Sequence, residues 1–340
     1  MAARRPSLNR PTLRQVAALS GVSVKTASRA LNGEPYVSAE TATKVRAAAE
    51  QLGFRRNAIA RDLRAGARSP LVGLIISDLA NPFYSRVARG AERRLRAAGL
   101  QLISASSDED PALEQTLVAE MLERRVSAIL LVTSAAEHHY LDTERRHGLP
   151  VVFLDRAPDD VVADTIVLDN AGGMRAAVDH LLQRGHRRIG LIGDLTRLAT
   201  YRERVTAFEA AMHTPGLADW AHYVRADCHD AKSAEAAAVD LLALAPPPTA
   251  LITTNNLITA GALRALRRTA NPPALVGFDD FDLADVLGVT VIAHSPERMG
   301  ELGADQIVAR LDGADGPAQR VVLPTELIVR EAADGTRQWE

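Results

Sequence analysis

The sequence predicts an N-terminal all-α headpiece followed by an α/β core of two doubly wound, parallel-sheet subdomains. Helical periodicity with capping residues fills positions 12–54, and from position 71 short β-branched runs alternate with amphipathic segments. Charge divides the chain in the same way. Residues 1–70 hold 13 Lys or Arg against 4 Asp or Glu, a net of +9, whereas the remainder holds 27 against 38. The length of 340 residues fits two or three domains.

The first 54 residues predict three short helices. Thr12, Ser23 and Ser38 each precede a helical run and can accept a hydrogen bond from its unpaired first-turn amides. Gly21 allows a tight turn between the first two helices, and Gly53 is placed to end the third. Two helices joined by a glycine turn and braced by a third are typical of a helix-turn-helix, whose second helix enters the DNA major groove. A plain three-helix bundle with a solvated outer face is the alternative.

The outer face of the second helix favours the DNA-binding interpretation. Residues three or four positions apart are neighbours on a helix, so one face carries Val24, Lys25, Ser28 and Arg29. The basic charge of residues 1–70 on an otherwise acidic chain is what neutralisation of DNA phosphates by one end of the molecule requires.

Nine apolar runs after position 70 predict the strands of the core. They lie at 71–76, 100–105, 128–132, 151–154, 165–168, 189–193, 250–253, 274–278 and 289–292. The helical stretches between them include 83–98, 111–125, 170–185, 201–213, 231–245 and 256–268. Most runs are apolar throughout, as expected for parallel strands covered by helices on both faces. So many units exceed one ordinary sheet, and we therefore expect two similar subdomains.

Motifs for nucleotide or hydrolytic chemistry are absent from the sequence. It contains no GxGxxG, GxxxxGK[ST], HExxH or GxSxG, so we expect no cofactor and no metal. A single cysteine, Cys228, excludes an internal disulfide and fits a reducing cytoplasm. The N-terminus lacks the apolar run of a signal peptide, and no run approaches the roughly 18 apolar residues of a membrane span. We expect a cytoplasmic protein without a membrane partner.

Shifts in composition suggest the domain boundaries. We expect a disordered basic tail at 1–11, the helix-turn-helix domain at 12–57, a hinge helix or linker at 58–69 and a core at 70–332. One core subdomain would comprise about 70–169 plus 295–324, and the other about 170–294 plus 325–332. Residues 55–66 carry Ala58, Ile59 and Leu63 at helical spacing, but so short a helix is marginal in isolation. We expect this segment to order only on its target, with an ordinary charged linker as the alternative.

A series of short motifs, in a fixed order along the chain, resembles the sequences of a known family. The motifs are GVSVKTASRALNG, VSAET, GFRRNAIARDL, NPF at 81–83, SSDED at 106–110, FLDR at 153–156, DNAGG at 169–173, RRIGLIG, TNN at 254–256 and VGFDD at 276–280. Through them the chain resembles the lactose/galactose repressor (LacI/GalR) family of bacterial transcription regulators over essentially its whole length. The resemblance implies a homodimeric repressor with a core like that of periplasmic sugar-binding proteins. Its partners would be double-stranded operator DNA and a small polar effector such as a sugar.

The resemblance also carries DNA-binding positions onto this chain. They are Val24, Lys25, Thr26, Ser28, Arg29, Asn32, Asn57, Ala60 and Leu63. Lys25 and Arg29 can donate hydrogen bonds to guanine O6 and N7, and Val24 can pack on a thymine methyl group. The other three helix positions would contact phosphates. Leu63 stands where the family inserts a leucine into the central minor-groove step. Arg56 stands where the family often has proline, which leaves the hinge geometry open.

The same resemblance implies an effector cleft between the subdomains. Its positions are Asn81, Phe83, Asp108, Thr133, Ser134, Asp155, Arg156, Leu168, Asn170, Thr200, Arg204, Asn255, Asp279 and His294. Asp, Asn and Arg side chains around an aromatic floor suit a polyol, because carboxylates accept from hydroxyls and guanidinium groups donate. Arg204 and Asp279 can alternatively form a structural ion pair. His294 stands where many family members use glutamine, which leaves the identity of the effector open.

Two other classes of protein stay open. A solute-binding protein for transport would need a signal peptide or lipid anchor and would have no use for residues 12–63. An α/β enzyme acting on a sugar or nucleotide would explain the paired carboxylates Asp279 and Asp280, but no nucleophile or metal constellation accompanies them.

Overall fold

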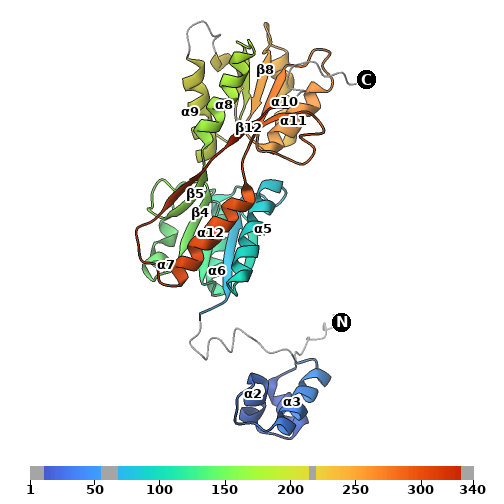
Figure 1. The fold of residues 1–340 in the computed structure, drawn as a ribbon, viewed down its shortest axis with the longest axis vertical. Coiled ribbons are helices and arrows are strands. Elements are labelled where there is room, and N and C mark those ends of the chain that lie inside the picture. The colour runs from blue at the N-terminus through green and yellow to red at the C-terminus, as the bar shows by residue number, and fades with distance from the viewer. Residues whose placement is uncertain (1–10, 55–67, 214–219, 331–340) are drawn as a thin grey trace, which may run out of the picture. The chain divides into compact units, whose positions relative to one another are not determined.

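The structure is a computed structural model that describes residues 11–54, 68–213 and 220–330 (Figure 1). It divides into two compact units, residues 1–69 and residues 70–340. The first unit holds a helical headpiece, and the second holds an α/β core with two six-stranded sheets. The fold class expected from the sequence is confirmed. Residues 1–10 of the expected tail (1–11) and residues 58–67 of the expected hinge (58–69) lie outside the described residues, as do residues 55–57.

The headpiece contains three helices: α1 (Leu13–Ser20), α2 (Val24–Asn32) and α3 (Ala39–Gln51). Each has the expected N-cap, because the hydroxyl of Thr12, Ser23 or Ser38 accepts a hydrogen bond from the amide three residues on. Gly21 ends α1 with a φ of 69°, in the left-handed region that favours glycine. Helix α3 ends two residues before Gly53.

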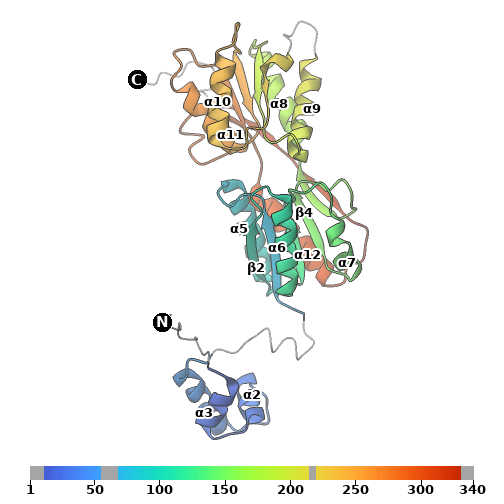
Figure 2. The same cartoon turned by 180° about the vertical axis from the view of Figure 1, so that it is seen from behind.

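The first core sheet is parallel throughout, in the order β11-β5-β4-β3-β1-β2. Its strands are β1 (Leu71–Ile76), β2 (Gln101–Ser106), β3 (Ala128–Leu131), β4 (Val151–Asp155), β5 (Asp164–Leu168) and β11 (Arg320–Leu323). One face packs against α5 (Pro82–Ala97) and α12 (Pro296–Leu311), and the other packs against α6 (Pro111–Glu123) and η1 (His139–Leu141), which is followed by α7 (Asp142–Arg146) (Figure 2). Alternate strand residues therefore serve two cores, Leu74 in one and Ile75 in the other.

Helices α5 and α12 pack closely because each has a glycine at the contact. A Cβ on Gly90 would lie 2.0 Å from the carbonyl oxygen of Glu297, and one on Gly300 would lie 2.0 Å from that of Val87. The same helices are joined by the ion pairs Arg86–Glu297, Arg93–Glu301 and Arg94–Asp305. Helix α12 follows the last parallel strand of the second sheet, so this contact returns the chain to the first subdomain.

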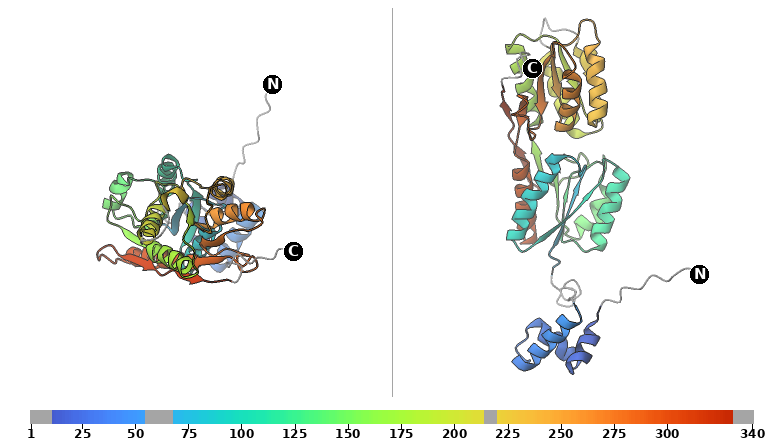
Figure 3. Two further views of the ribbon diagram at one scale, coloured as in Figure 1. Left: turned by 90° about the horizontal axis from the view of Figure 1, so that it is seen from above. Right: turned by 90° about the vertical axis from the view of Figure 1, so that its right-hand side faces the viewer.

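The second sheet has the order β12-β10-β9-β8-β6-β7, and only β12 runs antiparallel to its neighbour among these strands. Its strands are β6 (Ile189–Ile192), β7 (Val224–Arg225), β8 (Ala250–Thr253), β9 (Ala274–Phe278), β10 (Thr290–Ala293) and β12 (Glu326–Ile328). Helices α8 (Asn170–Gln183) and α9 (Ala199–Met212) cover one face, and α10 (Ala231–Leu242) and α11 (Asn256–Leu266) cover the other (Figure 3). The short helix η2 (Trp220–Tyr223) precedes β7.

The chain passes between the two sheets three times, after β5, after β10 and after β11. Loops that follow strands of both sheets meet between the subdomains, and doubly wound folds bind ligands at this edge. Within the described part of the chain, no helix is long and apolar enough to cross a membrane.

Candidate functional site

The outer face of α2 presents the side chains expected to read bases. Ala27 and Ala30 lie in the headpiece core, which turns the opposite face outward. Val24 is 44% exposed although it is apolar, and Lys25 beside it is exposed. Arg29 is half-exposed on the next turn. An exposed apolar group near two cations matches the methyl and acceptor groups that base pairs present in the major groove.

Glu34 holds two of the expected DNA contacts. Nε of Arg29 lies 3.4 Å from Oε2 of Glu34, and Nδ2 of Asn32 donates to Oε1 at 3.1 Å. The hydroxyl of Thr26 lies 2.9 Å from Oγ of Ser23, the N-cap of α2. The Glu34 carboxylate therefore competes with a DNA base or phosphate for Nε of Arg29. Glu34 was not predicted to take part in this site.

The remaining DNA-binding positions divide between the helix and the hinge. Ser28 is half-exposed on α2. Asn57, Ala60 and Leu63 lie outside the described residues, so their roles stay predictions.

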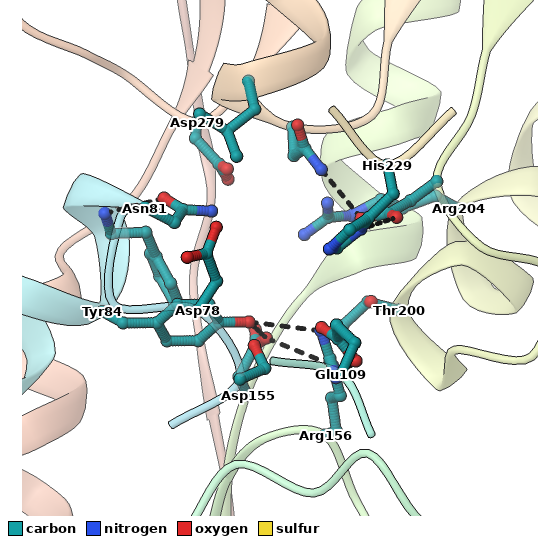
Figure 4. Close-up of a pocket in the computed structure, with 15 residues that line it drawn as sticks. Asp78, Asn81, Tyr84, Glu109, Asp155, Arg156, Thr200, Arg204, His229 and Asp279 are labelled. Carbon is teal, nitrogen blue, oxygen red and sulfur yellow. Dashed lines mark hydrogen bonds and ion pairs between the residues drawn. The ribbon is translucent and has the colours of Figure 1, made fainter. Parts of the chain in front are cut away.

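A pocket lies between the two core subdomains (Figure 4). We call it the interdomain cleft. It has about 450 Å³ of empty space, counting the part open to solvent. Its lining residues are Ser77, Asp78, Asn81, Phe83, Tyr84, Glu109, Asp155, Arg156, Asp194, Thr200, Arg204, His229, Asn255, Leu257 and Asp279.

Arg156 and Glu109 form a buried ion pair in the wall of the first subdomain. Nη1 of Arg156 donates to Oε2 of Glu109 at 2.9 Å, and Nη2 donates to Oε1 at 2.6 Å. Arg156 also donates to the carbonyl oxygen of Thr133 and to the hydroxyl of Tyr84. Burial alone would raise the pKa of Glu109, but Arg156 brings that pKa below its usual value. The two charges therefore persist at neutral pH, in a two-bond geometry that fixes the guanidinium plane.

Two buried aspartates, Asp155 at the end of β4 and Asp279 just after β9, lie on opposite walls of the cleft (Figure 4). Their φ angles, 67° and 71°, lie in the left-handed region, which aspartate tolerates better than most residues. Burial raises the pKa of Asp155, although Arg156 and Arg204 oppose it. Burial would also raise the pKa of Asp279, but the hydrogen bond from His294 at 2.8 Å and the charge of Arg204 lower it. Asp155 is thus the easier of the two to protonate.

Arg204 of α9 is held over an aromatic ring. Its Cζ lies 3.7 Å from the ring centroid of Phe278, which stabilises the cation. Its Nε donates to Oδ1 of Asn170 at 2.8 Å, and its Nη1 donates to the carbonyl oxygen of Thr254. Among the described residues Arg204 forms no ion pair with Asp279, so the alternative of a structural pair between them is wrong.

His229 and Asp194 form the far wall of the cleft. Nδ1 of His229 lies 2.8 Å from Oδ1 of Asp194, and Nδ2 of Asn255 donates to Oδ2 at 2.8 Å. The hydrogen bond to Asp194 raises the pKa of His229, which favours its cationic form. Because Asp194 follows β6 and His229 follows β7, two neighbouring strand ends supply this pair.

Several polar contacts join the two subdomains around the cleft. Nδ2 of Asn256 donates to Oδ1 of Asn81 at 2.9 Å, and Arg202 on α9 donates to Asp159 at 3.0 Å. Arg197 donates to two carbonyl oxygens of the opposite subdomain at 2.6 and 3.1 Å. The orientation of one subdomain relative to the other therefore depends on a few hydrogen bonds at the rim.

The structure brings together most of the effector positions expected from the sequence. Eight of them line the cleft: Asn81, Phe83, Asp155, Arg156, Thr200, Arg204, Asn255 and Asp279. Asn170 and His294 lie behind the lining and hold Arg204 and Asp279. Thr133 and Ser134 line a neighbouring pocket.

Two expected positions do not reach the cleft. Asp108 is exposed and accepts from the Ser106 hydroxyl at 2.6 Å, while its neighbour Glu109 turns inward. Leu168 is buried in the core between the first sheet and α5. Seven further residues line the cleft and were not predicted from the sequence: Ser77, Asp78, Tyr84, Glu109, Asp194, His229 and Leu257.

Comparisons with known proteins agree with this architecture. The model of "Bacterial regulatory proteins, lacI family" matches residues 12–57, and that of "Periplasmic binding proteins and sugar binding domain of LacI family" matches residues 69–276. The headpiece and cleft thus define a class of DNA-binding transcription regulator with a sugar-binding type of core. More particularly, the chain belongs to the LacI family.

Individual relatives cover nearly the whole chain. The transcriptional regulator PtxS of Pseudomonas aeruginosa is 33% identical over 335 residues, 96% of each chain. A solved complex of the regulator CelR with cellobiose is 30% identical, with a TM-score of 0.70, and covers 95% of this chain and 99% of its own. The Lac repressor dimer bound to operator, at 24% identity and a TM-score of 0.76, covers 96% and 99% and shares the fold.

The family consists of transcription regulators rather than enzymes, so the interpretation as an α/β enzyme is excluded, and that of a transport protein with it. The described residues also hold no group of three or more His, Cys, Asp or Glu side chains able to bind a metal ion.

Proposed function

We propose that the chain is a homodimeric repressor of an approximately palindromic operator, controlled by a small polyhydroxylated effector in the interdomain cleft. One recognition helix reads too few base pairs for genomic specificity, so two chains related by a two-fold axis would read two half-sites. The nine positions named from the sequence would make the operator contacts. The activity would take place in the cytoplasm, with the DNA.

The main support for an effector in the cleft is a group of buried polar atoms that lack hydrogen-bond partners. Among the described residues, five buried side-chain nitrogen or oxygen atoms have no hydrogen-bond partner. Four of them belong to residues in or beside the cleft: Ser77, Arg156, Asn256 and His294. Each unpaired buried group costs about 1–3 kcal/mol, so a ligand that bonds to them recovers much of that free energy.

The chemistry of the walls favours a ligand with several hydroxyl groups. Asp155 and Asp279 can accept from hydroxyls, and Arg204 and Asn255 can donate. Phe83 supplies an apolar surface for one face of a sugar ring, and its edge-to-face contact with His294, at 5.4 Å between ring centroids, fixes it.

Effector and operator binding would be coupled through the subdomain arrangement. A ligand that contacts both walls favours one relative orientation, and only such differential affinity shifts a population. Residues 55–69 directly precede the first subdomain in the chain. Rotation of this subdomain in a dimer would therefore change the distance between the hinge segments of the two protomers. Short helices with little core are marginal on their own, so the order expected of the hinges on DNA would depend on that spacing.

The test is an operator titration with the full-length protein, using duplexes selected from a random library, with and without a panel of sugars and polyols. We expect one panel member to change operator affinity by about 5–150-fold, the usual range of allosteric coupling. Deletion of residues 1–70 should abolish DNA binding and retain ligand binding. A monomer on operator DNA in sedimentation at physiological salt, or a complete lack of response to the panel, would contradict the proposal.

A further inference from the structure

The adjacent carboxylates Asp279 and Asp280 have different surroundings. Asp279 is 6% exposed and lies in the wall of the interdomain cleft (Figure 4). Asp280 is partly buried, does not line the cleft and forms an ion pair with Arg330. The second carboxylate therefore has a role other than contact with a ligand of the cleft.

Arg330 binds Asp280 through both of its terminal nitrogens. Nη1 donates to Oδ1 of Asp280 and Nη2 donates to Oδ2, each at 3.1 Å. Nη1 also donates to the carbonyl oxygen of Val289 at 3.0 Å. The Arg330 side chain is 16% exposed, so water screens this pair less than it screens an exposed one. Two parallel bonds between a guanidinium and a carboxylate fix the orientation of both groups.

The backbone of Arg330 is itself attached to the second sheet. Its amide donates to Oγ1 of Thr290 at 3.1 Å, and the Thr290 hydroxyl donates to its carbonyl oxygen at 3.3 Å. Thr290 is fully buried. These bonds continue the antiparallel pairing of β12 with β10, in which Ile328 lies opposite Val291. The Arg330 side chain therefore extends from a fixed point.

Arg330 joins the two ends of the loop between β9 and β10. Asp280 lies at the start of this loop and Val289 lies at its end, directly before β10. Between them Leu283 and Val286 are 63% and 74% exposed. The three hydrogen bonds from Arg330 thus hold the base of a loop whose tip is in solvent.

The backbone of Asp279 requires support of this kind. Its φ angle of 71° lies in the left-handed region, which a residue other than glycine keeps only where its surroundings hold it. On one side, the Asp279 amide donates to the carbonyl oxygen of Ile292 at 3.0 Å. On the other side, the next residue is Asp280, held by Arg330. This backbone directs the Asp279 carboxylate to Nε2 of His294, 2.8 Å away.

We propose that Arg330 is a positioning residue of the interdomain cleft, which holds Asp279 in place through its ion pair with Asp280 and does not itself contact the ligand. The part of this inference that concerns effector binding rests on the proposed function. The part that concerns the placement of Asp279 does not, so two experiments test them separately.

The first experiment needs no effector. Urea unfolding of the full-length protein at neutral pH gives the cost of His294→Ala in the wild type and in the Arg330→Gln and Asp280→Asn backgrounds. Independent sites contribute additively, whereas coupled sites do not. We expect the cost of His294→Ala to fall by at least half in both backgrounds, because the carboxylate that His294 binds is no longer held.

Arg268→Gln is the matched control background, since Arg268 is exposed and pairs with Glu235 away from the cleft. The cost of His294→Ala should be the same there as in the wild type. An unchanged cost in the Arg330→Gln and Asp280→Asn backgrounds would overturn the positioning role.

The second experiment measures sugar binding by calorimetry, well below the unfolding temperature of each variant, with ribose, fructose and cellobiose as probes. For a sugar that binds the wild type, Arg330→Gln should weaken binding about ten-fold, which is the contribution of one hydrogen bond to a charged group. Arg330→Lys keeps the cation and should retain part of the affinity. In an Asp279→Ala background, Arg330→Gln should cause no further loss, a dependence that a purely structural role would not produce.

The outcomes separate the positioning role from the function. A sugar that binds the wild type and Arg330→Gln equally tightly would overturn the positioning role and leave the effector function intact. A loss on Arg330→Gln that is as large without the Asp279 carboxylate as with it would also overturn that role. Absence of binding by every sugar tested would overturn the proposed function and the part of Arg330 in it, and the unfolding experiment would still decide whether Arg330 holds Asp279.

Discussion

Nε2 of His294 lies 2.8 Å from Oδ1 of Asp279, and both side chains are almost fully buried. Burial by itself would raise the pKa of Asp279, but the hydrogen bond and charge of His294, with the charge of Arg204, hold it below the ordinary value. A carboxyl group whose pKa is lower in the folded state stabilises the fold at pH values above its unfolded-state pKa of about 3.9. That contribution is lost as the pH falls through the folded-state pKa.

Replacement of His294 by alanine should therefore destabilise the core in a pH-dependent way. At pH 7 we expect a loss of about 1–3 kcal/mol in the free energy of unfolding, because the buried carboxylate loses its hydrogen-bond partner. The loss should shrink as pH falls below about 4 and Asp279 takes up a proton. Urea unfolding at pH 7 and at a pH below about 4 measures this loss. The control is His139→Ala, at an exposed histidine. An equal loss at the two pH values would contradict this role.

Arg204→Ala and Asp279→Ala should abolish the effector response and leave basal operator affinity nearly unchanged. Both side chains line the cleft and neither belongs to the headpiece. Operator titrations with and without the effector measure the response, and Arg268→Ala serves as the exposed control. If both cleft variants respond at wild-type effector concentrations, the cleft is not the effector site.

Lys25→Ala and Arg29→Ala should each relax base preference at one operator position, at a cost of about 1–3 kcal/mol. Both side chains project from α2, whereas Lys44 and Arg46 are exposed on α3 and should act through charge alone. Affinities for operators with single base changes, measured at several salt concentrations, separate the two effects. If a variant keeps its preference among operator bases and only the dependence of its affinity on salt concentration changes, the substituted residue does not read a base.

Glu34→Gln should strengthen operator binding several-fold. The Glu34 carboxylate holds Arg29 at 3.4 Å and Asn32 at 3.1 Å in the free headpiece, and it would repel nearby phosphates. The gain should be larger at low salt, since exposed charges are screened at high salt. Glu50→Gln on α3 is a control with the same change of charge. Equal gains for the two variants would show a general charge effect instead of release of Arg29.

The parts of the fold with regular patterns were predicted closely from the sequence. The runs at 250–253 and 274–278 coincide with β8 and β9, and the three headpiece caps lie where hydroxyl side chains were expected. Strands β7, β11 and β12 and helix α12 were not predicted. The edge strands β11 and β12 are short and partly exposed, with Arg320 and Glu326 in their patterns, so pairing across the sheet defines them rather than local sequence.

The position of the cleft was predicted from the sequence more accurately than the residues that line it. Motifs identify a loop, but the backbone of the loop decides which residue turns inward. Asp108 and Glu109 are adjacent and have φ angles of 50° and 59°, and this turn directs Glu109 to Arg156 and leaves Asp108 in solvent. His229 was missed because it follows β7, a two-residue strand without a recognisable apolar run.

Leu63→Ala should weaken specific operator binding far more than non-specific binding. Residue 63 lies outside the described part of the chain, and the expectation comes from its match to the leucine that the family inserts into the minor groove. A wedge contributes only where the central base step is kinked, whereas phosphate contacts do not depend on sequence. Affinities for operator and for random duplex at matched salt measure the difference, and Leu19→Ala, at an exposed leucine of α1, is the control. An equal loss on both duplexes would remove Leu63 from the wedge role, and the hinge would then contribute charge alone.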